Sequence, residues 1–167
     1  TDADHGKYLL FDFAGDTKTN SRSADVNFTV AGIDDYDSYI VEFDATIAPG
    51  ASQESNLAVK TTGFTAANNE VATGGYLISL VNKVNEKIGN DYTVNGITDA
   101  VVTIPSGQWH HYKLYVDKVK KLVTLTITDA NGTPLKGADK LVVTYESGGD
   151  VTGIFWRAGR YGAVEGL

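Results

Sequence analysis

The chain has 167 residues, which is enough for one domain with its own hydrophobic core. A formal net charge of −7 at pH 7 argues against nucleic acids and anionic membranes as partners, and the absence of cysteine excludes disulfides and thiol chemistry. There is no apolar run of the ~18 residues that a membrane span needs, no signal peptide and no methionine, so we expect a module excised from a larger secreted protein.

Short runs in which apolar and polar residues alternate predict β-strands along the whole chain. In chain order, strands are expected at residues 7–13, 26–30, 38–47, 56–60, 75–82, 92–94 and 101–104, in a hairpin within 107–133, and at 140–145 and 153–160. The stretch from Thr61 to Gly75 is rich in Thr, Ala, Asn and Gly and is predicted to be a surface loop. This spacing favours a single all-β domain over residues 1–167, built as a sandwich of two antiparallel sheets.

The alternation is strongest in the hairpin and in the strand at residues 38–47. In each of these strands every second side chain is large and apolar, which places one face of the strand on a core. The residues expected to share that core are Tyr39, Val41, Phe43, Tyr112, Leu114, Val116, Val123, Leu125 and Ile127. The other face of the second hairpin strand, residues 122–128, is mostly threonine. Threonine favours a pleated strand and offers hydroxyls to solvent or to a ligand.

The hairpin opens on the sequence Trp-His-His-Tyr at residues 109–112. This opening, followed by such a hairpin, resembles the concanavalin-like (laminin-G-type) jelly-roll sandwiches. The resemblance implies a jelly-roll fold and a function in binding or cutting carbohydrate. Among such domains, the chain resembles the carbohydrate-binding modules of secreted bacterial enzymes that degrade polysaccharides.

Two carboxylates lie on the outward face of the strand at residues 38–47. Glu42 and Asp44 are two residues apart, which places them roughly 7 Å from each other. The sequence Glu42-Phe43-Asp44 resembles the Glu-x-Asp core of the laminarinase-type glycoside hydrolases. That family has a further glutamate as acid/base where this chain has Thr46, so we expect no hydrolysis. The alternative is a strand that carries two solvated acids.

A second resemblance lies near the C-terminal end. Residues 155–161, Phe-Trp-Arg-Ala-Gly-Arg-Tyr, resemble the Tyr-Phe-Lys-Ala-Gly-x-Tyr strand of alginate-lyase-type jelly rolls. The resemblance implies that Arg157 and Tyr161 line the binding cleft, where a guanidinium would favour an acidic glycan such as pectin or alginate. We expect Glu42, Asp44 and Tyr115 on the same sheet face. The alternative is a final core strand in which Trp156 is buried and the arginines are solvated.

Other aromatic residues are candidate platforms for sugar rings. Tyr115 is expected on the outward face of its strand, and Tyr76 and Tyr92 follow polar or glycine-rich segments. Each of these is a candidate carbohydrate-binding residue, although a buried tyrosine with a satisfied hydroxyl is an equally common use of this side chain. We expect Trp109 to pack at the edge of the core.

Carboxylates cluster before the strand at residues 38–47. Asp34, Asp35 and Asp37 are candidate ligands of a structural calcium ion, because such oxygen donors suit calcium. The same run also fits a simple turn without a cofactor. His110 and His111 point to opposite faces of their strand and do not predict a zinc site.

These observations favour a non-catalytic carbohydrate-binding module that recognises a plant or algal polysaccharide. We expect an extracellular or cell-surface location, and a monomer within a multidomain chain. Two alternatives stay open. One is a catalytic jelly roll, either a polysaccharide lyase or a glycoside hydrolase. The other is a structural or adhesion domain of a bacterial surface protein, since fold does not fix function.

Overall fold

A computed structural model describes residues 22–46, 55–66, 72–82, 91–95, 97–145 and 150–158. The described strands are β1 (Arg22–Asn27), β2 (Ser38–Thr46), β3 (Asn56–Ala66), β4 (Ala72–Val81), β5 (Asp91–Val94), β6 (Ile97–Thr103), β7 (Trp109–Asp117), β8 (Leu122–Thr128), β9 (Leu141–Thr144) and β10 (Val151–Ala158). A 3-10 turn, η1 (Ile33–Asp35), precedes β2. The strand expected at residues 7–13 lies outside the described residues.

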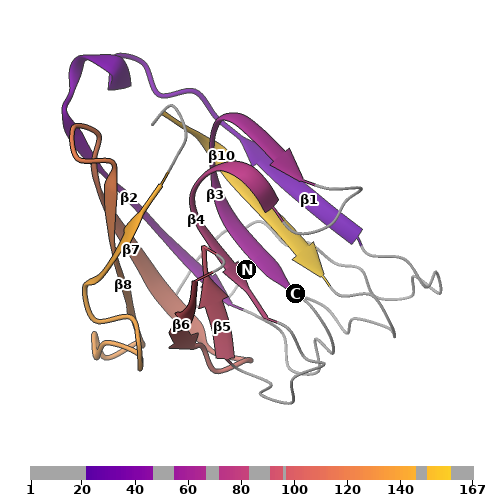
Figure 1. The fold of residues 1–167 in the computed structure, drawn as a ribbon. Helices are drawn as coiled ribbons and strands as arrows, with labels where there is room; N and C mark the ends of the chain where they lie inside the picture. The colour runs from indigo at the N-terminus through magenta and orange to yellow at the C-terminus, as the bar shows by residue number, and fades with distance from the viewer. Residues whose placement is uncertain are drawn as a thin grey trace.

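The strands form two sheets that pack face to face (Figure 1). One sheet has six strands in the order β1-β10-β3-β4-β5-β6, and the other has four in the order β2-β7-β8-β9. Neighbouring strands pair antiparallel in both sheets. The predicted all-β sandwich is therefore confirmed. No helix in the described part of the chain is long and apolar enough to cross a membrane.

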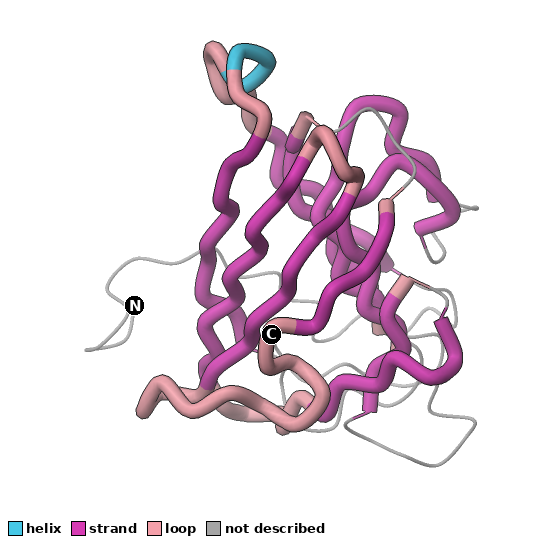
Figure 2. The backbone as a smooth tube through the Cα atoms, turned by 60° about the vertical axis from the view of Figure 1, so that its left-hand side comes forward, coloured by secondary structure: helices cyan, strands magenta, loops and turns pink. Residues whose placement is uncertain are grey.

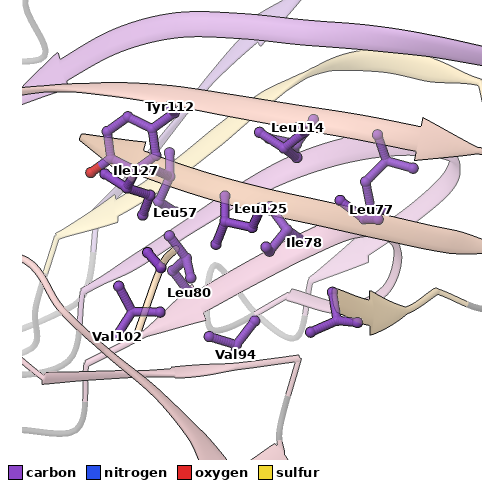
Figure 3. Packing of buried hydrophobic residues seen from close by; sticks show 14 of the residues in the cluster. Leu57, Leu77, Ile78, Leu80, Val94, Val102, Tyr112, Leu114, Leu125 and Ile127 are labelled. Atoms are coloured by element: carbon purple, nitrogen blue, oxygen red, sulfur yellow. The ribbon is translucent and has the colours of Figure 1, made fainter. Parts of the chain in front are cut away.

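The core lies between the two sheets (Figure 3). Its members from the six-stranded sheet include Leu57, Leu77, Ile78 and Leu80, which face Tyr112, Leu114, Leu125 and Ile127 of the other sheet. The nine residues expected to share a core all do so: six are fully buried, and Tyr39, Val41 and Phe43 on the edge strand β2 pack against the cluster while half-buried. The rings of Phe43 and Tyr112 stack with centroids 4.9 Å apart.

The prediction of a surface loop from Thr61 to Gly75 is wrong. Strand β3 continues to Ala66 and β4 begins at Ala72, so most of this stretch belongs to an irregular antiparallel hairpin. One of its glycines meets a backbone constraint there. Gly75 has φ +68°, and a Cβ at this position would lie 2.3 Å from the backbone nitrogen of Phe64. Gly75 therefore allows two strands to approach closely.

The four-stranded sheet has one face on the core and one face toward solvent. In Figure 2 the turn η1 leads into β2, and the four strands lie in front of the six-stranded sheet. Along β7 the burial alternates strictly, with buried residues at His110, Tyr112, Leu114 and Val116 and more exposed ones between them. This alternation leaves a broad accessible surface on β2, β7, β8 and β9.

Candidate functional site

The accessible surface of the four-stranded sheet is here called the open face. Strand register divides it into three rows that run across the strands. The first row is Ile40, Tyr115, Thr124 and Val142; the second is Glu42, Lys113 and Thr126; the third is Asp44, His111 and Thr128. The open face thus brings together three residues predicted from sequence: Glu42, Asp44 and Tyr115.

The first row exposes apolar surface. Ile40 is 51% exposed, Tyr115 44% and Val142 56%, although each lies on a well-paired strand. Ile40 and Tyr115 are direct cross-strand neighbours, about 4.5–5.5 Å apart, and Thr124 lies between Tyr115 and Val142, so the four side chains form one strip across the sheet. A phenol ring in such a strip offers a flat apolar face together with a polar hydroxyl.

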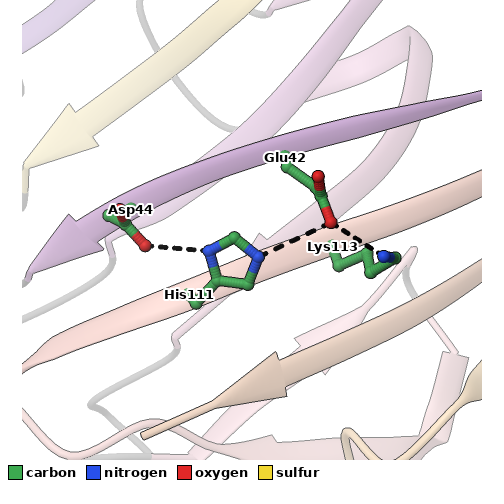
Figure 4. Close-up of polar contacts among 4 residues, drawn as sticks. All are labelled: Glu42, Asp44, His111 and Lys113. Atoms are coloured by element: carbon green, nitrogen blue, oxygen red, sulfur yellow. Dashed lines mark hydrogen bonds and ion pairs between the residues drawn. The ribbon is translucent and has the colours of Figure 1, made fainter. Parts of the chain in front are cut away.

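The second and third rows form one polar chain across β2 and β7 (Figure 4). Lys113 Nζ lies 2.8 Å from Glu42 Oε1, and His111 Nδ1 lies 2.9 Å from Asp44 Oδ1. His111 Nε2 lies 3.7 Å from Glu42 Oε1, so the imidazole stands between the two carboxylates. The hydrogen bond from Lys113 lowers the pKa of Glu42, which keeps this carboxylate ionised at neutral pH.

This arrangement suits hydrogen bonding to hydroxyl groups better than bond cleavage. A glycosidase needs a sugar between its two carboxyl groups, and one of them must be protonated. Here His111 fills the space between Glu42 and Asp44, and Lys113 favours the charged form of Glu42. The chain of donors and acceptors instead resembles a polar surface that can exchange water for sugar hydroxyls.

A groove of about 490 Å³ continues from this polar chain at the end of the sheet. It lies where β2 ends, β7 begins and β8 ends, and the described residues lining it are Asp44, Trp109, His110, His111, Thr128, Asp129, Ala130 and Gly132. Sequence reasoning missed Trp109, His110 and Asp129 as a group. The signal was present in the hairpin register, which brings the Trp-His-His opening beside the Asp-Ala-Asn-Gly turn.

Arg157 does not lie on the open face. It belongs to β10 of the six-stranded sheet, so the expectation that it shares a sheet face with Glu42, Asp44 and Tyr115 is wrong. Trp156 packs in the main core, as expected, and Arg157 points away from that core with an exposed fraction of 0%. Tyr161 lies outside the described residues. A role of Arg157 and Tyr161 in glycan binding stays a prediction.

The two remaining tyrosines lie elsewhere. Tyr92 is only 3% exposed and belongs to the core, where its hydroxyl accepts a hydrogen bond from Ser55 Oγ at 3.2 Å. Burial raises its pKa. Tyr76 is half-buried and lines a smaller cavity of about 210 Å³ with Asn95, Ile97 and Tyr145. Neither tyrosine is part of the open face.

The candidate calcium ligands lie at the opposite end of β2. Asp34 and Asp35 belong to η1, and Asp37 follows it. The carboxyl of Asp34 hydrogen-bonds to Asp150, which raises the pKa of Asp34 and lowers that of Asp150. Within the described ranges no three His, Cys, Asp or Glu side chains are grouped closely enough to hold a metal ion. A calcium site at Asp34, Asp35 and Asp37 stays a prediction.

The fold and the open face define a jelly-roll β-sandwich of the concanavalin-like kind. It is similar to a GH131 beta-glucanase catalytic domain from Podospora anserina, with a TM-score of 0.53 and 12% sequence identity, over 87% of this chain and 68% of that chain. At this identity the likeness concerns the fold alone. No family model matches the sequence, and no curated protein matches it.

Proposed function

We propose that this protein is a polysaccharide-binding domain that holds a glycan chain on its open face. The observation that carries the proposal is the exposed Tyr115 within an apolar strip, directly beside the polar chain of Glu42, Lys113, His111 and Asp44. Sugar rings have apolar C–H faces and polar hydroxyl rims. A surface on which an apolar row adjoins a row of hydrogen-bonding groups matches both parts of a sugar.

The extent of the surface across four strands also fits a long ligand. Strands in a sheet lie about 4.8 Å apart, so the strip from Ile40 to Val142 extends across all four strands. A polymer lying along it would contact several side chains at once, and each weak contact would add to the affinity. Threonine hydroxyls of β8 add further donors and acceptors along the same track.

The test is binding of the full chain to a panel of soluble polysaccharides and oligosaccharides, measured by calorimetry. Tyr115→Ala should weaken binding about tenfold or more if Tyr115 is an anchor. Tyr36→Ala is a matched control, because Tyr36 is a 64% exposed tyrosine that precedes β2 and belongs to none of the three rows of the open face. Wild-type protein that binds no glycan would overturn the proposal and leave the structural or adhesion alternative.

Hydrolysis of a β-glucan is the second candidate function. The structural neighbour is a beta-glucanase catalytic domain, which favours a catalytic jelly roll better than binding alone, and Glu42 and Asp44 supply a carboxylate pair. The two residues are spaced roughly 7 Å apart along the strand, and the His111 ring lies between their carboxylates. Reducing-end assays on β-glucans decide between the two. Product that forms with wild type and disappears in Glu42→Gln would establish catalysis.

A further inference from the structure

A small cavity lies where the edge of the open face meets the six-stranded sheet. Its volume is about 210 Å³, and the described residues lining it are Thr73, Tyr76, Asn95, Ile97, Thr144, Tyr145 and two glycines. They come from the first part of β4, from the turn between β5 and β6, and from the end of β9. Thr73, Ile97 and Thr144 are exposed, so the cavity opens to solvent at these residues.

The two walls of this cavity are held at a fixed spacing by Asn95. Its side-chain Nδ2 donates a hydrogen bond to Thr144 O of β9 at 3.2 Å, and its Oδ1 accepts one from Ser79 N of β4 at 2.7 Å. Its backbone N also donates to Ser79 O at 2.9 Å. One residue therefore joins the two sheets at this edge. A cavity that is already formed loses little conformational freedom when a ligand enters.

The cavity continues the apolar strip of the open face. Val142 is the last member of the strip, and Thr144 lies two residues further along the same outward face of β9, roughly 7 Å away. A glycan chain that follows the strip from Ile40 past Tyr115 therefore reaches β9 beside the cavity. Ile97, which is 42% exposed, adds apolar surface at the rim.

The lining favours a single neutral sugar residue. None of the lining residues that the structure describes carries a charge, so a carboxylate would lose its water there without gaining a counter-charge. Thr73 and Thr144 offer hydroxyls that can both donate and accept, as the hydroxyls of a sugar do. The volume is below the roughly 300–1,000 Å³ of a whole small-molecule site, which fits one ring and not several.

We infer that this cavity is a terminal subsite for a neutral sugar residue of a glycan chain that lies on the open face. The inference rests on the proposed function and extends it in two respects. It assigns Thr144 and Ile97 to the ligand, beyond the edge of the sheet, and it requires that the residue bound there is uncharged.

The test compares cellotriose and laminaritriose with cellohexaose, laminarihexaose and a hexagalacturonate on the full chain. Calorimetry measures affinity, and NMR follows the side-chain methyl resonances of Ile97 and Thr144 in the wild-type protein. We expect a neutral hexaose to bind about tenfold or more tighter than its triose and to move both methyl resonances, whereas the hexagalacturonate leaves them unmoved.

Variants at the rim of the cavity give the second measurement. Thr144→Val keeps a β-branched side chain on β9 but removes the hydroxyl, and should weaken hexaose binding about three- to tenfold. Thr144→Ser should bind like wild type, because it keeps the hydroxyl. Ile97→Ala should also weaken hexaose binding. Thr29→Val is the matched control, because Thr29 is an exposed threonine after β1 that lines neither the cavity nor the open face.

The outcomes separate this inference from the proposal that it extends. Hexaose binding that Tyr115→Ala weakens, but that leaves the two methyl resonances unmoved and Thr144→Val unaffected, overturns the subsite and keeps the open face. Methyl resonances that move while Tyr115→Ala binds like wild type overturn a chain that spans both sites. A hexagalacturonate that moves them overturns the neutral specificity. Wild-type protein that binds no glycan overturns both proposals.

Discussion

Asp44 on β2 and His111 on β7 are direct register partners, and their side chains meet with Oδ1 and Nδ1 2.9 Å apart. The pair connects two parts of the surface, because His111 also reaches toward Glu42 and Asp44 also lines the groove. One imidazole therefore sets how the carboxylates on this face are spaced and oriented. The open face and the groove therefore share one residue of the polar chain, Asp44.

Removing Lys113 from the polar chain of the open face should change the pKa of Glu42. Lys113 is the main reason that the pKa of Glu42 is lowered, so Lys113→Ala should raise the Glu42 midpoint toward its ordinary value. A lowered pKa contributes stability that is present above the unfolded value, near 4.3, and is lost as the pH falls through the folded value. Carboxyl ¹³C NMR during a pH titration measures the midpoint. Lys136→Ala is the control, and an equal midpoint in Lys113→Ala and wild type would contradict the assignment.

Asp34→Asn should stabilise the protein at neutral pH and much less in acid. The pKa of Asp34 is raised because its carboxyl hydrogen-bonds to Asp150 and the two charges repel. Such a group stabilises the fold below its unfolded pKa, near 3.9, and loses this contribution as the pH rises through the folded value. An amide donates to Asp150 at any pH without a charge. Thermal unfolding at pH 4 and pH 8 measures the effect, and Asp35→Asn in the same turn is the control. An equal gain at both pH values would disprove the explanation.

Leu125→Ala should cost about 2–5 kcal/mol of unfolding free energy. Leu125 is 0% exposed and lies between Leu114 and Leu141 in the four-stranded sheet, where truncation leaves a cavity in the core. Val119→Ala in the β7–β8 turn is the control, because Val119 is 72% exposed and should change stability by only about 0.5 kcal/mol or less. Urea unfolding measures both. A loss below about 1 kcal/mol for Leu125→Ala would show that the core packs differently.

The sequence predicts much of the fold because alternation in β2, β7 and β8 reports directly which side chains face the core. It also predicts that Glu42, Asp44 and Tyr115 point outward, since parity alone decides that. Arg157 shows the limit of this argument. The alternation of side chains correctly places Arg157 and Trp156 on opposite faces of β10. It does not say which sheet a strand joins, or whether the outer face of that strand is covered.

The groove was missed for a related reason. Trp109 and Asp129 are twenty residues apart, and each has an ordinary local explanation, as the start of a strand and as a turn residue. Only the antiparallel register of β7 and β8 brings them together. The loop predicted at Thr61 to Gly75 failed because composition does not distinguish a flexible glycine from one that a close backbone contact requires.

Gly137→Ala should destabilise the protein more than Gly132→Ala, although both glycines have a left-handed backbone, with φ +82° and +78°. The loop around Gly137 joins the two sheets: Lys136 O accepts a hydrogen bond from Thr103 N at the end of β6, and Ala138 O accepts one from Ile127 N in β8. A Cβ at Gly137 would lie 2.0 Å from the backbone oxygen of Val101, whereas one at Gly132 would meet nothing within 4 Å. Gly132→Ala should therefore lower the free energy of unfolding by about 1–2 kcal/mol, because only the left-handed backbone is strained. Gly137→Ala should lower it by roughly 1–3 kcal/mol more, because the backbone of β6 must also move. Urea unfolding of the two variants compares them directly, and equal losses would mean that this loop does not pack against β6 as described.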